Sequence, residues 1–177
     1  MAEMIFAGFG GQGVMSMGMM VAYAGMIEEK NVSWIPSYGP EMRGGTANCA
    51  VVVTAEEIGS PIITEPDVVV AMNLPSMNKF EPMLKPGGLL IYNSSLIERE
   101  GGRDDITVIG VPANQLATEL GNSRVANMIV MGALLAKTKV VGTESIKKAL
   151  RQVLPSHRHD LLGINEEAIQ RGAEYAK

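Results

Sequence analysis

The sequence predicts a three-layer α/β/α domain built on a mixed, mostly parallel sheet. Short apolar segments alternate with longer helix-compatible segments, the pattern of a sheet that lies between layers of helices. Several strand candidates are apolar at every position, as expected for strands buried on both faces. At 177 residues the chain is long enough for one well-buried core and too short for two ordinary domains, so we expect residues 1–177 to form a single domain.

The first expected elements are a strand at residues 4–7 and a helix at residues 12–29, separated by glycines. Two further strands are expected at residues 32–35 and 47–54, and Pro36 is expected to end the first of them. The loop between these two strands is too short to hold a crossover helix, so as neighbours they must run antiparallel. This makes the predicted sheet mixed.

The rest of the chain continues the alternation and ends mainly in helices. Pro75 opens a helix at a favoured first-turn position, and Thr143 has the residue type of a helix N-cap. Gly121 and Gly142 fit helix ends. The expected strands are residues 67–72, 89–92 and 106–111, and the expected helices are residues 75–84, 113–120, 125–137, 144–154 and 166–175.

The composition limits which kinds of function the chain can carry. Its formal charge is −4, so it lacks the excess of Lys and Arg that nucleic-acid binding needs. Cys49 is the only cysteine, and it cannot form a disulfide within the chain or supply the thiolates of an iron–sulfur cluster or a Cys-rich zinc site. Any such cluster must sit on another chain, and we expect a reducing, cytoplasmic environment.

Apolar residues are frequent, which points to a partner subunit. Hydrophobic residues make up 46% of the chain and charged residues only 19%, and the mean hydropathy is +0.13. Part of the surface is therefore expected to be buried against another subunit. Residues 5–27 are almost wholly apolar, but glycines divide them into a strand and a helix, so no membrane span is expected. Residues 1–3 lack the basic side chains of an export signal.

The sharpest local signal is the glycine-rich segment at residues 8–13, Gly-Phe-Gly-Gly-Gln-Gly. It follows an expected strand and opens an expected helix, in the G-x-G-x-x-G pattern of Rossmann-like folds. Glycines allow close backbone approach, and the helix N-terminus offers unpaired N–H groups to an anion such as phosphate. The alternative is a tight turn that binds nothing. A dinucleotide site would also need an acidic residue at the end of the next strand, where Pro36 and Ser37 stand instead.

A second candidate segment is the loop at residues 37–45, which should emerge at the same edge of the sheet as the glycine-rich turn. Both segments would then line one crevice. Gly44 and Gly45 free the backbone around Arg43, whose planar guanidinium suits a phosphate or a carboxylate. The alternative is that Arg43 pairs with Glu41 and only holds the loop.

Two smaller features are better explained by structure than by chemistry. Cys49 stands at the start of an apolar strand, where a free cysteine is usually a small buried side chain. Residues 157–160, His-Arg-His-Asp, fall short of a metal site and fit a solvated or interface turn. We therefore predict no catalytic residue and no metal ligand in this chain.

Three segments of the chain resemble the gamma subunit of 2-oxoacid:ferredoxin oxidoreductases, and the resemblance extends over nearly the whole chain. They are residues 8–14, Gly-Phe-Gly-Gly-Gln-Gly-Val, residues 38–49, Tyr-Gly-Pro-Glu-Met-Arg-Gly-Gly-Thr-Ala-Asn-Cys, and residues 126–128, Ala-Asn-Met. In this family the gamma chain is equivalent to one domain of the fused pyruvate:ferredoxin oxidoreductases. Residues 42–46 are more similar to the 2-oxoglutarate-type gamma chains than to the pyruvate type.

The resemblance implies a place in a multi-subunit enzyme. Such an enzyme decarboxylates a 2-oxoacid oxidatively with coenzyme A, giving an acyl-CoA, carbon dioxide and reduced ferredoxin; for 2-oxoglutarate the acyl-CoA is succinyl-CoA. Alpha, beta and delta subunits are the implied partners, and ferredoxin is an indirect one. The sequence has no Gly-Asp-Gly motif followed by Asn to hold magnesium and thiamine diphosphate. Those cofactors and the iron–sulfur clusters are therefore expected on partner chains.

For this chain the resemblance implies a scaffold whose crevice contacts coenzyme A or another subunit. The rival interpretation is an independent nucleotide- or flavin-binding, Rossmann-like oxidoreductase that uses the same glycine-rich turn. The candidate contact residues are Gly8, Gly10, Gly11, Gln12, Gly13, Tyr38, Glu41, Arg43 and Gly44.

Overall fold

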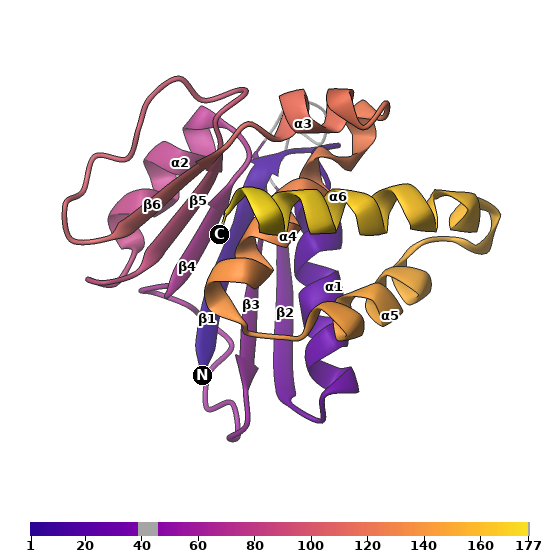
Figure 1. The fold of residues 1–177 in the computed structure, drawn as a ribbon. Coiled ribbons are helices and arrows are strands. Elements are labelled where there is room, and N and C mark those ends of the chain that lie inside the picture. Colours follow the sequence, from indigo (N-terminus) through magenta and orange to yellow (C-terminus); the bar gives the residue numbers. More distant parts are fainter. Residues whose placement is uncertain (39–45, 177) are drawn as a thin grey trace.

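One six-stranded sheet organises the part of the chain that the structure describes, residues 1–38 and 46–176 of a computed structural model (Figure 1). The strands lie in the order β2 (Asn31–Tyr38), β3 (Thr46–Thr54), β1 (Ala2–Phe9), β4 (Val68–Ala71), β5 (Leu89–Asn93) and β6 (Thr107–Val111). β1, β4, β5 and β6 are parallel, whereas β3 runs antiparallel to both of its neighbours. The prediction of a mixed, mostly parallel sheet is confirmed.

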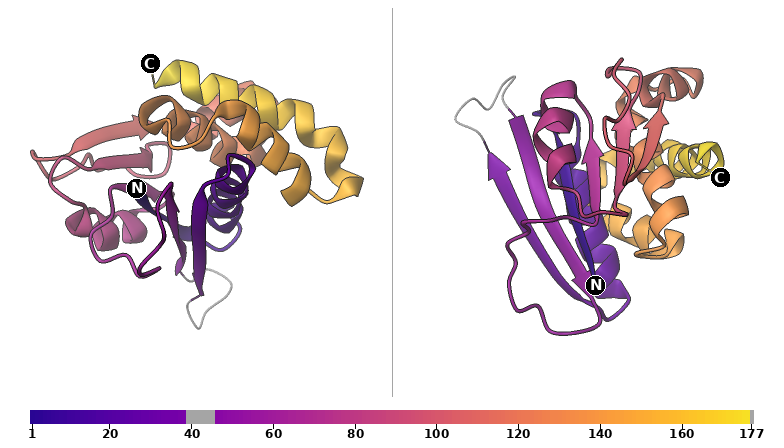
Figure 2. Two further views of the ribbon diagram at one scale, coloured as in Figure 1. Left: turned by 90° about the horizontal axis from the view of Figure 1, so that it is seen from below. Right: turned by 90° about the vertical axis from the view of Figure 1, so that its left-hand side faces the viewer.

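Helices cover both faces of the sheet, but unequally (Figure 2). One face carries α1 (Val14–Ile27), α3 (Ala113–Glu119), α4 (Ala126–Thr138) and α5 (Thr143–Val153), with α6 (Leu162–Tyr175) packed on α4. The 3-10 helices η2 (Ser123–Val125) and η3 (Ser156–Leu161) precede α4 and α6. The opposite face carries α2 (Leu74–Phe80) and the 3-10 helix η1 (Glu81–Met83). The predicted three-layer architecture is confirmed, with one thick helical layer and one thin one.

β1 shows why the central strands are apolar throughout. Met4 and Phe6 point into the core beneath the thick helical layer, and Ile5 and Ala7 point into the core beneath α2. All four side chains are buried. Successive side chains of a strand point to opposite faces, so a strand that is covered on both faces needs apolar residues at every position.

Glycines let α4 and α6 cross with their backbones in contact. A Cβ atom on Gly132 would meet the backbone oxygen of Ile169, and one on Gly172 would meet the backbone oxygen of Ile129. Neither position can therefore hold a side chain without separating the two helices. The close crossing brings η3, which leads into α6, beside the start of α4.

The prediction that Pro36 ends its strand is wrong. β2 continues to Tyr38, and Pro36 pairs with Cys49 of β3. β2 is an edge strand of the sheet, so one side of its backbone faces away from the ladder. A proline whose nitrogen lies on that side removes no hydrogen bond from the sheet.

The N-cap predicted for α5 is also wrong. Thr143 is the first residue of the helix, and Gly142 is its N-cap. The Gly142 N–H donates to Glu28 Oε1 at 2.6 Å, so a carboxylate that follows α1 holds the residue at which α5 begins. α6 begins at Leu162, before the predicted residue 166, because η3 leads directly into it.

The helix predicted from Pro75 to residue 84 is divided in two. α2 ends at Phe80 and η1 follows, since Pro82 lacks the N–H that a continuing α-helix would use. Gly121 follows the end of α3 with a φ angle of 81°, as the prediction of a helix end there requires.

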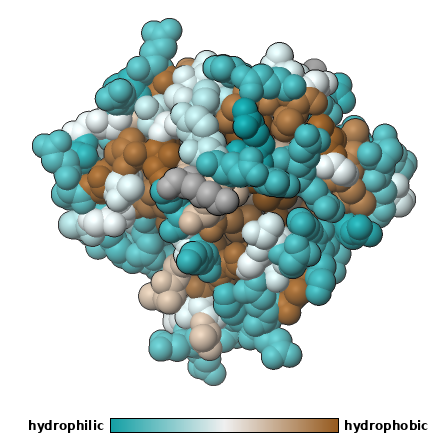
Figure 3. All heavy atoms as spheres, in the orientation of Figure 1, coloured by the Kyte–Doolittle hydropathy of each residue, from teal (hydrophilic) through white to brown (hydrophobic). Residues whose placement is uncertain are grey.

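The surface over the thick helical layer is mixed. Figure 3 shows apolar patches separated by hydrophilic side chains on the face seen in Figure 1. Met26 and Tyr175 are exposed by 58% and 51%. Such side chains are the kind that the partner subunit expected from the composition would cover. No helix in the described part of the chain combines the length and the apolar character that a membrane crossing needs.

Candidate functional site

The glycine-rich turn lies at the carboxyl ends of the parallel strands, the edge at which open α/β sheets bind ligands. Gly11 and Gly13 have φ angles of 95° and 77°, which residues with a Cβ atom rarely adopt. α1 begins directly after the turn, at Val14. No side chain among the described residues caps α1, and its first turn holds no acid. The N–H groups at the positive end of α1 are therefore open to an anion.

Gln12 closes the turn and ties it to the next strand. Its Oε1 accepts a hydrogen bond from the Phe9 N–H at 2.7 Å, and its Nε2 donates to the Met72 carbonyl oxygen at 3.1 Å, just past β4. Gly8 leaves room for this arrangement, because a Cβ on Gly8 would lie 2.6 Å from Gln12 Oε1 and 2.9 Å from Met72 Cβ. The position of the open N–H groups is thus held by side-chain hydrogen bonds as well as by the backbone.

A cavity of about 630 Å³, named here the polar chamber, opens at this edge and has the size of a small-molecule site. The glycine-rich turn, the ends of β4 and β5, the start of α3 and the η2–α4 junction line it. Asn93, the fully buried last residue of β5, donates to Asn114 Oδ1 at 2.7 Å on its wall. The Asn93 Oδ1 atom accepts from the Ser95 N–H at 3.2 Å. The wall is therefore polar and held in place by its own hydrogen bonds.

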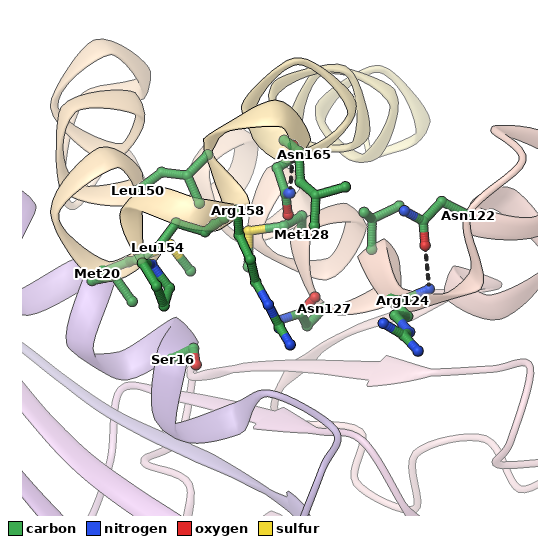
Figure 4. A pocket seen from close by; sticks show the side chains of 14 residues that line it. Ser16, Met20, Asn122, Arg124, Asn127, Met128, Leu150, Leu154, Arg158 and Asn165 are labelled. Atoms are coloured by element: carbon green, nitrogen blue, oxygen red, sulfur yellow. Dashed lines mark hydrogen bonds between the residues drawn. The ribbon is translucent and has the colours of Figure 1, made fainter.

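A second cavity of about 220 Å³, named the apolar chamber, lies between α1, α4, α5 and η3 (Figure 4). Arg124, Asn127 and Arg158 line both chambers and so stand where the two meet. In Figure 4 the Arg158 side chain extends from η3 toward Asn127 at the start of α4. Four of the apolar side chains that line this chamber are Met20, Met128, Leu150 and Leu154.

The charged side chains that line the two chambers are all positive. No Asp or Glu among the described residues lines either chamber, although the whole chain has a formal charge of −4. In the same part of the chain, Arg124 and Arg158 form no ion pair, whereas Arg99, Arg103 and Arg171 each bind a carboxylate. A guanidinium binds phosphate or carboxylate through two parallel hydrogen bonds. The two chambers together are therefore suited to an anion.

The structure brings together the predicted contact residues of the first segment. Gly8, Gly10, Gly11, Gln12 and Gly13 all belong to the turn or to the end of β1, and Gly11 and Gln12 line the polar chamber. Their contact with a ligand stays a prediction.

The second predicted segment begins and ends at the same edge of the sheet. Tyr38, exposed by 62%, pairs with Ala47, and Ala47 pairs on its other side with Gly8. Glu41, Arg43 and Gly44 lie outside the described residues, so their part in the crevice stays a prediction.

The sequence did not predict the residues that the two chambers share. The sequence connects Asn127 with the site only through the family resemblance, it predicts a solvated or interface turn for Arg158, and it carries no prediction for Arg124. One signal could have found Arg124, which stands directly ahead of the helix expected at residues 125–137, whereas Arg158 lies eight residues before the helix expected at 166–175. A basic side chain is unfavourable next to the positive end of a helix, and an anion bound there would compensate.

The topology argues against the dinucleotide-binding alternative. In that fold the strand after the first helix lies beside the first strand, and an acid at its end holds the ribose. Here that strand is β2, which the antiparallel β3 separates from β1 and which ends at Tyr38. The position that should hold the ribose is displaced from the glycine-rich turn.

Cys49 is a buried core residue, as predicted. Its Sγ lies 3.5 Å from the Val14 carbonyl oxygen, and Gly18 of α1 leaves the space that it occupies. Burial raises the pKa of the thiol to about 12, so the group stays protonated. Among residues 1–38 and 46–176, no group of three or more His, Cys, Asp or Glu side chains is placed to hold a metal ion.

The fold and the site define a class of protein: an α/β scaffold with a mixed sheet, a glycine-rich turn and an anion-suited cleft at one sheet edge. Comparison with known proteins narrows this class. Residues 3–175 match the family described as pyruvate ferredoxin/flavodoxin oxidoreductase, and the chain belongs to that family.

Two relatives show the range of this family. The chain is 38% identical over 172 residues to the ketoisovalerate oxidoreductase subunit VorA of Methanothermobacter thermautotrophicus, covering 97% of this chain and 35% of VorA. It is 31% identical over 178 residues to the 2-oxoglutarate synthase subunit KorC of Methanocaldococcus jannaschii, covering 99% of this chain and 94% of KorC. The chain thus spans about a third of VorA and nearly all of KorC.

A solved structure agrees with the fold over the whole chain. The crystal structure of the keto/oxoacid ferredoxin oxidoreductase gamma subunit from Geobacter sulfurreducens superposes with a TM-score of 0.85 at 29% identity. The superposition covers 99% of this chain and 98% of that subunit. The resemblance to gamma subunits that the sequence indicated is confirmed.

Proposed function

We propose that the chain acts as the gamma subunit of a multi-subunit 2-oxoacid:ferredoxin oxidoreductase, with residues 1–177 as one domain. The observation that carries this proposal is the near-complete superposition on a solved gamma subunit. The cleft at the carboxyl ends of the parallel strands supports it, because coenzyme A brings phosphate groups that such a cleft suits.

The proposed substrate is 2-oxoglutarate. Residues 42–46 resemble the 2-oxoglutarate-type gamma chains, and KorC matches this chain over nearly its whole length. The complex would convert 2-oxoglutarate and coenzyme A to succinyl-CoA and carbon dioxide and reduce ferredoxin. Ketoisovalerate is a second candidate, favoured by the higher identity to VorA.

The cofactor chemistry is assigned to partner subunits. A single cysteine cannot ligate an iron–sulfur cluster, and Cys49 is buried in the core. We therefore assign thiamine diphosphate, magnesium and the iron–sulfur clusters to the alpha, beta and delta partners, which also meet ferredoxin. This chain contributes the scaffold and a contact to coenzyme A.

The proposed contact combines the two segments at the carboxyl edge of the sheet. The turn at residues 8–13 presents N–H groups at the positive end of α1, and Gln12 holds the turn in place. Arg43 belongs to the segment that begins and ends at the same edge, next to Tyr38 and Thr46. A phosphate group held by both would have a charge-assisted bond as well as backbone donors.

Isolation of the native complex tests the assembly. The tagged chain should copurify with alpha, beta and delta subunits, and the complex should reduce ferredoxin or a viologen dye only with coenzyme A and a 2-oxoacid. Assays with 2-oxoglutarate, ketoisovalerate and pyruvate separate the substrate candidates. A chain that purifies alone, carries a flavin or binds NAD would contradict the proposal.

Arg43→Ala tests the coenzyme A contact. Loss of a charge-assisted bond to phosphate should weaken coenzyme A binding to the complex by about tenfold. Arg151→Ala, at an exposed position of α5 that lines neither chamber, is the matched control. Unchanged affinity of the Arg43 variant in an intact complex would remove Arg43 from the contact.

A further inference from the structure

We infer that the apolar chamber binds a small organic anion that carries a compact apolar body, with the anionic group between Arg124 and Arg158. Gly11 and Gln12 of the glycine-rich turn line only the polar chamber, which adjoins the apolar chamber at Arg124, Asn127 and Arg158. The inference therefore goes beyond the proposed function and does not depend on which 2-oxoacid the complex uses.

The inner wall of the chamber fits a compact hydrocarbon group. Met20, Met128 and Leu150 are each exposed by 2% or less, so the wall belongs to the hydrophobic core. The volume of about 220 Å³ exceeds the roughly 150 Å³ of an apolar cavity that takes up benzene. Methionine side chains adapt to irregular shapes, which favours a group with a flexible chain. A body of about six carbons fits this space.

The opening of the chamber fits an anion. Arg158 reaches it from η3, Arg124 from η2, and Asn127 stands between them in the first turn of α4 (Figure 4). α4 is 13 residues long and continues from η2, where the Arg124 N–H donates to Asn122 Oδ1 at 3.0 Å, and the positive end of this helical segment adds to the field of the two guanidinium groups. No acid among the described residues lines the chamber and competes for the arginines.

The same lining disfavours other occupants. The described residues around the chamber include no aromatic ring on which a nucleobase could stack and no carboxylate that could hold a cation. Inorganic phosphate would use only the opening, and a neutral hydrocarbon would use only the inner wall. A ligand that satisfies both parts needs an anionic group and an apolar body in one molecule.

Four probes separate these contributions when their binding to the full chain is measured by titration calorimetry and thermal shift. Hexanoate and hexyl phosphate carry both parts, hexan-1-ol lacks the charge, and inorganic phosphate lacks the apolar body. The hexyl anions should bind at least about tenfold more tightly than hexan-1-ol or inorganic phosphate. The tighter of the two identifies the ligand class as a carboxylate or a phosphate ester.

Two variants and one control locate the binding. Arg158→Gln should weaken binding of the hexyl anions by about tenfold or more, because it removes a charge-assisted hydrogen bond at an exposed position. Leu154→Ser, on the half-buried side of the chamber, should weaken the hexyl anions but leave inorganic phosphate unchanged. Arg151→Gln, which makes the same charge change outside the chamber, should have no effect. Far-UV circular dichroism checks that each variant folds.

Several results would overturn the inference. They are the absence of saturable binding by either hexyl anion, equal binding by wild type and Arg158→Gln, and inorganic phosphate or hexan-1-ol binding as tightly as the hexyl anions. An increase in melting temperature that depends on Arg158, and that coenzyme A causes but the hexyl anions do not, would assign the chamber to coenzyme A instead. These titrations do not use the oxidoreductase activity, so their failure is distinguishable from failure of the proposed function.

Discussion

The two ends of the sheet use their polar groups in opposite ways. At the amino ends of the parallel strands, the Lys85 ammonium group binds the carboxylates of Glu3 and Asp67 at 2.6 and 3.0 Å. At the carboxyl ends, Arg124 and Arg158 line the two chambers without an ion pair in the described part of the chain. We call the amino ends of the parallel strands the closed end and their carboxyl ends the open end. The closed end uses its charged groups for stability, and the open end keeps its hydrogen-bond donors for a ligand.

The closed end also joins the helices to one another. Glu28, just after α1, accepts hydrogen bonds from the Lys30 ammonium group at 2.8 Å and from the Gly142 N–H at 2.6 Å. Lys30 donates in addition to the Val140 carbonyl oxygen at 2.7 Å, between α4 and α5. These hydrogen bonds therefore connect α1, α4 and α5 at the end of the sheet where no ligand is expected.

The largest effect on stability is expected in the glycine-rich turn. Gly13→Ala should lower the free energy of unfolding by about 2–3 kcal/mol, since it combines a positive φ angle with a close approach to Asn127. Gly11→Ala has a similar φ angle but no atom within 4 Å of the new Cβ, and should cost about 1 kcal/mol. Urea unfolding measures both. Equal losses would show that the contact with Asn127 has no energetic weight.

Lys85→Met tests the closed end and should lower stability by about 1–2 kcal/mol at pH 7, because it leaves two carboxylates without their partner. The hydrogen bond to Glu3, with further contributions from Asp67, raises the pKa of Lys85 above 10.5. A raised pKa of a base stabilises the fold below the unfolded pKa, and this contribution is lost as the pH rises through the folded pKa.

The difference between wild type and Lys85→Met should therefore be complete at pH 7 and should shrink above pH 10.5. Lys148→Met, at an exposed position of α5, is the control and should change stability very little. A control that loses as much stability as Lys85→Met would contradict the assignment of the effect to the two ion pairs.

Glu28→Gln should cost about 1 kcal/mol at pH 7, after allowance for solvent screening of this surface group. Burial raises the pKa of Glu28. Hydrogen bonds from Lys30, the Gly142 N–H and Ser145 together outweigh this effect and lower the pKa to about 2. A lowered carboxyl pKa stabilises the fold above its ordinary value of 4.5, and this stability is lost as the pH falls from 4.5 to about 2. Unfolding measured across that range should show the two proteins converging; a constant difference would refute this origin.

The smallest effect on stability is expected for Gln12→Ala, at about 1 kcal/mol or less, because the two hydrogen bonds that it removes are partly exposed. If the turn holds coenzyme A phosphates as proposed, the affinity of the complex for coenzyme A should nevertheless fall several-fold, because the N–H groups lose their fixed position. Unchanged affinity with reduced stability would make Gln12 a structural residue only.

The type of most elements could be predicted from local pattern. β1 and β4 are apolar at successive positions and α1 follows glycines, and each of these features acts within a few residues. The errors at Pro36 and Thr143 have another cause. The edge position of β2 permits the proline, and α5 begins one residue earlier than predicted, after Gly142, whose N–H is bound by Glu28, a residue distant in sequence.

The candidate site could be predicted only in part. The turn at residues 8–13 has a local signature, whereas Arg124 and Arg158 come from 3-10 segments in front of two different helices. Both line the two chambers, where the crossing of α4 and α6 in backbone contact at Gly132 and Gly172 places η3 beside the start of α4. Nothing local to either arginine specifies that crossing.

The sequence by itself determined the alternation of strands and helices, the position of the glycine-rich turn, and the need for partner chains to supply any cluster. These follow from hydrophobic periodicity, backbone freedom and the count of thiols, which are properties of short segments or of composition. Only the tertiary structure decided that one end of the sheet pairs its charges while the other leaves two arginines at a cleft. That distinction depends on which distant side chains become neighbours, and packing of the helices on the sheet sets it.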